Sequence, residues 1–279
     1  MSANRIARRN VLFALGAAAI PQARAASGLL RATRVDHVAL AVGDIDKAML
    51  FYRRLFGNDV LKNVRTPRRY LRLGPCYLGI EPAAAGQAKR IDHAGIGIEN
   101  FDQDAMKSSL EKAGLKVREG AGLFVNDPDG TTIQIWADQS WKLNNAAPEP
   151  GPKQEALFHP RGMHHLSIQV TDMARALDFY GKLFGEQVPG AGNPPQPTFM
   201  AGETRIVLYN PAPNKPARID HFSVLVDSFD APAAVKVLKE LGARAELSRE
   251  GILNEFFDPD GIRLQVTFPG QTYGPAPKK

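Results

Sequence analysis

Four short segments of the chain alternate between large aliphatic residues and small or polar ones. They span residues 35–42, 91–98, 163–170 and 219–226. Successive side chains of a strand point to opposite faces, so this alternation predicts strands with one face on an apolar layer and the other facing a space. The small or polar face carries one histidine at the same register in each segment: His37, His93, His165 and His221. We therefore expect the histidine faces to line cavities.

The histidines also reveal an internal repeat. His37 and His93 are 56 residues apart, as are His165 and His221, and the second pair follows the first by 128 residues. A fixed internal period indicates repeated structural units. The chain is therefore predicted to have two similar halves, each made of two modules.

A predicted helix follows each histidine segment. Residues 44–57 match residues 172–185 at the same offset of 128, and both stretches begin with an aspartate suited to an N-cap and end in a glycine suited to the C′ position. Residues 101–114 and 229–242 are the second pair of helices. Two or three short strand-like runs follow each helix. The repeated unit is thus a strand, a helix and about three strands.

These units predict an α+β fold with two domains, residues 33–141 and 161–270. Between them, residues 142–160 include a polar, proline-rich stretch that is typical of a linker. Residues 271–279 are predicted to be a frayed tail.

Residues 1–25 are predicted to be a signal peptide. Arg8 and Arg9 precede a short apolar run at 11–20, and residues 23–25 have the small–x–small pattern of a cleavage site. The run is about half the length that a membrane-spanning helix needs. The paired arginines resemble a twin-arginine signal, with a general secretory signal as the alternative. Either route predicts a periplasmic or secreted protein without a membrane span after cleavage.

Charge and cysteine content restrict the partners. The formal net charge is +6, but the signal segment contributes four arginines and no acidic residue, which leaves 31 basic and 29 acidic residues elsewhere. No nucleic-acid partner is therefore expected. The single cysteine, Cys76, excludes an internal disulfide and a cysteine-rich zinc site. We expect a small-molecule substrate or ligand, and the sequence leaves open a homodimer in which modules swap between subunits.

Paired modules of this kind, with a histidine opening each one and Asp-Pro-Asp-Gly turns at 127–130 and 258–261, resemble the vicinal oxygen chelate superfamily. This group includes glyoxalase I, fosfomycin- and bleomycin-resistance proteins and extradiol dioxygenases. The resemblance covers residues 33–141 and 161–269. It implies four βαβββ modules that form two glyoxalase-like domains with curved mixed sheets around a cavity. It does not identify the reaction, because one fold hosts many chemistries.

The resemblance also implies a divalent metal ion, Fe, Mn, Zn or Ni, held by two histidines and a glutamate on a last strand. The glutamate position falls on glutamine in both halves, four residues after the glycine of each turn. A neutral amide oxygen should bind the ion more weakly and favour an anionic ligand. The histidines could instead be hydrogen-bonded residues of a small-molecule pocket. The implied ligand sets are His37, His93 and Gln134, and His165, His221 and Gln265.

Glu81 is a further candidate ligand, because glyoxalase-like members supply a glutamate from the strand at 76–81. By alignment the ligand position itself falls on Gly79, and the second half has Asn210 in the place of Glu81. His164, next to His165, is expected on the outer face as a packing or surface residue.

Two classes of function remain. One is a metal-dependent enzyme, a dioxygenase or a glyoxalase-like lyase, that acts on a small vicinally oxygenated compound. The other is a non-catalytic binding or resistance protein that uses the same cavities. Four histidines in register favour the enzyme, and the two glutamines favour the binding protein.

Overall fold

The structure is a computed structural model that describes residues 28–192, 194–213 and 215–270 of the 279-residue chain. The predicted signal peptide, residues 1–25, and the predicted tail, residues 271–279, lie outside this part. Within the described residues, no helix has both the length and the apolar character to cross a membrane.

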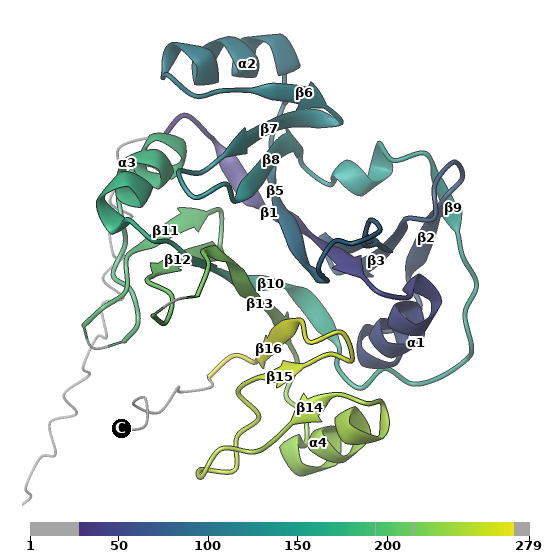
Figure 1. Ribbon diagram of the computed structural model, residues 1–279. Coiled ribbons are helices and arrows are strands. Elements are labelled where there is room, and N and C mark those ends of the chain that lie inside the picture. The colour runs from purple at the N-terminus through teal and green to yellow at the C-terminus, as the bar shows by residue number, and fades with distance from the viewer. Residues whose placement is uncertain (1–27, 193, 214, 271–279) are drawn as a thin grey trace, which may run out of the picture.

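Two mixed sheets carry the fold, one from each half of the described chain (Figure 1). The first has the order β6-β7-β8-β5-β1-β4-β3-β2-β9, and the second β11-β12-β10-β13-β16-β15-β14. The strands of the first sheet are β1 (Ala32–Val42), β2 (Val60–Asn63), β3 (Arg69–Leu73), β4 (Cys76–Pro82), β5 (Arg90–Ile98), β6 (Arg118–Gly120), β7 (Gly122–Asn126), β8 (Thr132–Ala137) and β9 (Ala146–Pro148). Those of the second are β10 (Pro160–Gln169), β11 (Thr198–Ala201), β12 (Thr204–Tyr209), β13 (Arg218–Val226), β14 (Arg244–Ala245), β15 (Phe256–Phe257) and β16 (Arg263–Thr267). The predicted α+β class is confirmed.

Four helices of the described chain follow the four histidine strands. They are α1 (Ile45–Phe56), α2 (Gln103–Lys112), α3 (Met173–Phe184) and α4 (Ala231–Glu240). Each begins after an aspartate whose side chain accepts hydrogen bonds from the first-turn backbone, as Asp44 and Asp172 were predicted to do. After α1 and α3 the chain turns at Gly57 and Gly185, whose φ angles of 98° and 87° favour glycine.

The two modules of each half join within this chain. β1 pairs with β5 in antiparallel orientation, and β10 pairs with β13 in the same way. β1 also pairs in parallel with β4, and β5 with β8, so each histidine strand is surrounded by partners of its own half. The aliphatic faces of these strands are buried, Val38, Leu40 and Leu166 completely.

Two local features differ from the sequence prediction. The linker contains β9, which pairs with β2 and extends the first sheet. Glu149, just after β9, forms ion pairs with Arg53 at 2.9 Å and Arg69 at 2.7 Å, so this segment is attached to the first domain. In the third module, the run after α3 forms only an isolated bridge between Val188 and Thr198 in place of a full strand.

The two halves contact each other through reciprocal tyrosine–aspartate hydrogen bonds. Tyr52 of α1 donates to Asp258 at 2.8 Å, and Tyr180 of α3 donates to Asp127 at 3.0 Å. Both aspartates open an Asp-Pro-Asp-Gly turn, so the turn of each half receives a helix of the other. Figure 1 accordingly shows α3 beside β7 of the first half and α1 beside the last strands of the second half.

Backbone amides of the same turn bind the other carboxylate oxygen of each aspartate. Asp127 accepts from the backbone of residues 129 and 131, and Asp258 from that of residues 260 and 262. All four side chains of the two pairs are buried. We call these two pairs, Tyr52–Asp258 and Tyr180–Asp127, the interdomain clamp.

Removing either hydroxyl of the interdomain clamp should destabilise the fold. Hydrogen bonds to charged groups contribute about 1.5–3 kcal/mol, so Tyr52→Phe and Tyr180→Phe should each lower the free energy of unfolding by about that amount. Urea denaturation measures it. Tyr77→Phe is the matched control, because the buried Tyr77 hydroxyl forms a neutral hydrogen bond with Ser140 within the first half. Clamp variants that cost no more than this control would contradict the prediction.

Candidate metal centres

The first centre is built on three neighbouring strands, β1, β5 and β8. In the register of the sheet, His37 lies opposite Gly95, and Gly95 lies opposite Gln134. His93 precedes Gly95 by two residues, so it shares that face of β5 and is a diagonal neighbour of His37. The pairing of the strands therefore aims two imidazoles and one amide at the same point.

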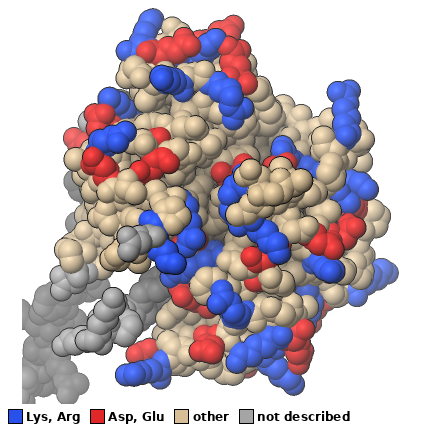
Figure 2. All heavy atoms as spheres, in the orientation of Figure 1, with Lys and Arg blue, Asp and Glu red and all other residues tan. Residues whose placement is uncertain are grey.

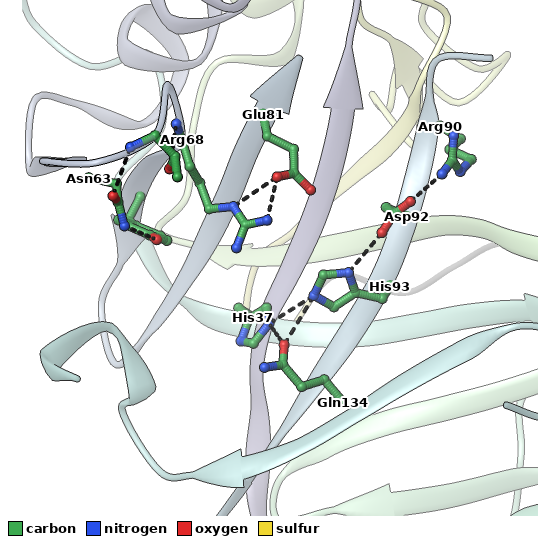
Figure 3. A network of polar contacts seen from close by, with 10 residues as sticks. His37, Asn63, Arg68, Glu81, Arg90, Asp92, His93 and Gln134 are labelled. Carbon is green, nitrogen blue, oxygen red and sulfur yellow. Dashed lines mark hydrogen bonds and ion pairs between the residues drawn. The ribbon is translucent and has the colours of Figure 1, made fainter. Parts of the chain in front are cut away.

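The tips of these three side chains meet (Figure 3). Gln134 Oε1 is 2.9 Å from His37 Nε2 and 3.1 Å from His93 Nε2, and the two Nε2 atoms are 3.4 Å apart. All three residues are buried. Two atoms that bind one ion at about 2.1 Å are themselves roughly 3–3.4 Å apart. The structure thus brings His37, His93 and Gln134 to the separations that a shared ion requires.

Gly95 leaves the space that His37 occupies. A Cβ atom at this position would overlap the imidazole of His37, which reaches across β5 toward Gln134. Gly79 on β4 lines the same cavity, but a Cβ there would meet its nearest neighbour, the ring of Tyr77, at 3.8 Å, an ordinary contact. The lack of a side chain therefore matters at Gly95 and not at Gly79.

Each histidine follows a residue that the antiparallel pairing skips. The register of β1 and β5 omits Asp36 on one strand and Asp92 on the other. Such a β-bulge adds a residue to one strand and redirects side chains. Asp36 Oδ2 lies 3.1 Å from His37 Nδ1, and Asp92 Oδ2 lies 3.0 Å from His93 Nδ1. The bulges thus place a carboxylate behind each ring.

These carboxylates determine which ring nitrogens are free. An ionised carboxylate only accepts hydrogen bonds, so Nδ1 carries the proton of each neutral ring and Nε2 presents a lone pair. Burial lowers the pKa of His93 more than the hydrogen bond to Asp92 raises it, which keeps this ring neutral. Gln134 donates its amide N–H to the carbonyl of Ala121, so its Oε1 faces the two rings.

Three lone pairs therefore point at one another in the first centre. Acceptor atoms at these separations repel each other unless a cation lies between them. No three His, Cys, Asp or Glu side chains of the described residues are grouped as a metal site, so a metal ion here would depend on the glutamine oxygen. Imidazole nitrogen and amide oxygen suit divalent transition metals. The residues present fit such an ion with three protein ligands.

The second centre repeats this row on β10, β13 and β16. His165 lies opposite Ser223, and Ser223 lies opposite Gln265. The Nε2 atoms of His165 and His221 are 3.3 Å apart. A hydrogen bond joins Gln265 to His165, and Asp220, again a skipped residue, lies 2.8 Å from Nδ1 of His221. These three contacts match the contacts His37–His93, His37–Gln134 and Asp92–His93 of the first centre.

His164 takes the place that Asp36 has in the first half. It is the residue skipped by β10, and its Nδ1 lies 2.8 Å from Nδ1 of His165. It also lines the cavity of the second centre, so the prediction of an outward-facing residue was wrong. The bulge interrupts the alternation on which that prediction was based. Burial lowers the pKa of His164, and lowers that of His165 well below its ordinary value.

Glu81 does not join the first centre. Its carboxylate accepts hydrogen bonds from Arg68, with Nε at 2.9 Å, and Figure 3 shows it turned toward that guanidinium. It lies opposite Ala41, which is two residues beyond Ala39, the partner of His93, and four residues beyond His37 on β1. Glu81 therefore lines the cavity without approaching the histidines.

The counterpart of Glu81 in the second half is Tyr209 and not Asn210. Tyr209 pairs with Gln169 on β10 as Glu81 pairs with Ala41 on β1. The earlier assignment of Asn210 was displaced by one residue. The second cavity consequently has a phenol where the first cavity has a carboxylate.

Each centre opens into its own cavity. The first has a volume of about 270 Å³ and is lined by His37, His93 and Gln134 together with Glu81. The second has about 520 Å³ and is lined by His164, His165, His221 and Gln265 among others. Two small residues of the predicted histidine faces line these cavities, Ala39 in the first and Ser167 in the second.

Replacing Gly95 by alanine should disturb the first centre. The added methyl overlaps the His37 ring, and overpacking of this kind costs about 1–3 kcal/mol. We expect a lower free energy of unfolding in urea for Gly95→Ala and little change for Gly79→Ala, which has room. Equal stability of both variants and the wild type would show that His37 does not occupy this space.

Comparison with solved structures supports the same fold. A 2,3-dioxygenase, LapB from Pseudomonas sp. KL28, aligns with a TM-score of 0.64 and 17% identity, over 89% of this chain and 98% of that one. A Mn(II)-bound glyoxalase from Novosphingobium aromaticivorans aligns with a TM-score of 0.63 and 17% identity, over 85% and 82%.

Sequence comparison leads to the same group of proteins. Lactoylglutathione lyase GLX1 of Arabidopsis thaliana is 27% identical over 175 residues, which are 54% of this chain and 54% of that protein. The chain thus spans about half the length of the curated relatives it matches. Residues 34–135 and 162–266 both match one family, which confirms the resemblance of the repeated modules. The chain belongs to the Glyoxalase/Bleomycin resistance protein/Dioxygenase superfamily.

Proposed function

We propose that this protein is a divalent-metal-dependent enzyme, a dioxygenase or a glyoxalase-like lyase, that acts on a small compound with two adjacent oxygens. The observation that carries the proposal is the convergence of three possible ligand atoms in the first centre: the two histidine Nε2 atoms and Gln134 Oε1. Relatives named lactoylglutathione lyases and structures named dioxygenases and a Mn(II)-bound glyoxalase support this class.

In this proposal the protein ligands would bind the metal ion and thereby orient the substrate. Two neutral imidazoles and a neutral amide leave positions open for both oxygens of the substrate, and they do not reduce the charge of a divalent ion. A substrate that chelates as an anion is thereby favoured over a neutral one. The bound ion would act as a Lewis acid toward charge that develops on the substrate oxygens. Asp36 and Asp92 keep the rings in the tautomer that exposes Nε2.

A non-catalytic binding protein is the second candidate. The glutamine in both centres favours it, because a carboxylate would hold the ion more tightly. Both candidates use the same cavities, so metal binding alone does not separate them. Turnover of a vicinally oxygenated compound by the metal-loaded chain would favour the enzyme, and stoichiometric binding without turnover would favour the binding protein.

Metal binding tests the common part of both candidates. Calorimetric titration with Mn(II), Fe(II), Zn(II) and Ni(II) should detect binding by the wild type. Gln134→Glu and Gln265→Glu should each tighten the binding at their own centre about tenfold or more, about 1.4 kcal/mol, because a carboxylate adds a negative charge beside the ion.

Loss of one histidine should remove one centre only. We expect His93→Ala to abolish binding at the first centre and His221→Ala at the second, so each should lower the number of ions bound per chain. His159→Ala is the control, since His159 is exposed and lines neither cavity. If the wild type and both glutamate variants bind none of the four ions, the metal proposal fails.

We also infer that the protein is exported through the twin-arginine route to the periplasm, on the basis of residues 1–25. Replacing both Arg8 and Arg9 by lysine in the full chain should retain the precursor in the cytoplasm of a bacterial host that has this route. Cell fractionation and the size of the protein measure the outcome. Continued export of the variant would assign the segment to the general secretory route, and no export of the wild type would contradict export altogether.

A further inference from the structure

We propose that the second cavity is the one that takes the substrate, and that Arg205 binds a carboxylate group of that substrate. This assignment rests on the proposed function, in which the two adjacent oxygens of the substrate chelate a metal ion. In the second cavity that ion would be held by His165, His221 and Gln265. The assignment adds a chemical class: small oxygenated compounds that also carry a carboxylate.

The two halves differ at the position opposite the first histidine on the neighbouring parallel strand. In the first half, Tyr77 lies opposite His37, and in the second half Arg205 lies opposite His165 at the same register. The ring of Tyr77 stacks on His37 at 4.7 Å between centroids, and its hydroxyl is 2.8 Å from Ser140. Tyr77 is thus a packed wall of the first cavity, whereas Arg205 puts a cation at that place in the second.

Arg205 has no carboxylate partner among the described residues. It is exposed, it lines the second cavity, and neither an ion pair nor a side-chain hydrogen bond to it is present in that part of the chain. The other arginine of this cavity, Arg263, is neutralised by Glu255 at 2.9 Å and Asp220 at 2.5 Å. One uncompensated positive charge therefore remains in the lining.

The balance of charge separates the two cavities. Arg68 and Arg118 line the first cavity together with the carboxylates of Glu81 and Asp92. Among the described residues, no carboxylate lines the second cavity. Figure 2 shows basic side chains gathered over the region where Figure 1 places β12 and β13. A cavity whose entrance carries mainly positive charge attracts anionic ligands.

Size points to the same cavity. Small-molecule sites usually have volumes of about 300–1,000 Å³. The second cavity, at about 520 Å³, lies in this range, and the first, at about 270 Å³, lies below it. The register explains the difference, because Tyr70 and Tyr77 of the first half correspond to Thr198 and Arg205.

Arg205 is also close to the second centre. It lies opposite His165 in the parallel pairing of β12 with β10, and both residues line the second cavity. A ligand bound at the centre would therefore lie beside the guanidinium. A single planar guanidinium matches a carboxylate with two parallel hydrogen bonds, while a doubly charged phosphate would keep one charge unpaired.

A pair of probes that differ by one carboxylate tests the proposal. Catechol and 3,4-dihydroxybenzoate offer the same adjacent oxygens, and only the second carries the carboxylate. We expect the full chain, loaded with Mn(II), to bind 3,4-dihydroxybenzoate at least tenfold more tightly than catechol in calorimetric titrations. In Arg205→Gln this preference should disappear, because only 3,4-dihydroxybenzoate loses a partner for a carboxylate. Arg205→Lys should retain part of the preference, because it keeps the charge.

Arg161→Gln is the matched control, since it makes the same change of net charge at an exposed residue that lines neither cavity. Its preference should equal that of the wild type. The same titrations on the metal-free chain separate this inference from the metal proposal: a preference that depends on Arg205 without any metal would support the carboxylate site even if metal binding failed. Equal affinities for the two probes, a preference that survives in Arg205→Gln, or no binding of either probe would overturn the proposal.

Discussion

The antiparallel pairing of β1 with β5, repeated by β10 with β13, is the interaction on which both centres depend. It joins the two modules of a half and makes two histidines from distant parts of the sequence diagonal neighbours on one face. A slip of one residue would turn those side chains to the opposite face. The bulges within the same pairing supply Asp36 and Asp92 behind the rings, so one set of backbone hydrogen bonds fixes ligands and their partners together.

The aspartates of the first centre contact the histidine rings on the side away from the point where the ligand atoms meet. Asp36 and Asp92 contact Nδ1 atoms, while the atoms that face the shared point are all neutral. A carboxylate among those neutral atoms would compete with an anionic ligand for the positive charge of a bound ion. With glutamine in place of a carboxylate, a bound ion would be held less tightly. Its positive charge would attract an anionic ligand more strongly. In the second half, His164 takes the place of one of the two aspartates. The second centre therefore has one negative charge fewer near a bound ion, which would increase its attraction for an anionic ligand.

Period and alternation were sufficient to predict the two halves, the four histidine strands and the capped helices. The meeting of His37, His93 and Gln134 was predicted from the resemblance to the vicinal oxygen chelate superfamily, which supplied the position of the third ligand. Period and alternation failed at His164 because a bulge breaks strict alternation, and bulges follow from the pairing of strands rather than from one strand alone. Arg205 was missed, although the offset of 128 already aligns it with Tyr77. The interdomain clamp could not be predicted from the sequence. Tyr52 and Asp258 are 206 residues apart, and no local pattern at either residue indicates that they form a hydrogen bond.

The interdomain clamp has a consequence for how the two centres could come to differ. Each half gives one tyrosine and receives one, which is the exchange of contacts found across a two-fold axis between identical subunits. In a true dimer any substitution appears in both copies at once. Here the copies are joined in one chain, so a codon can change in one half alone. Tyr77 can stay a packed wall while Arg205 becomes a cation, and the symmetric scaffold is free to hold two unlike sites.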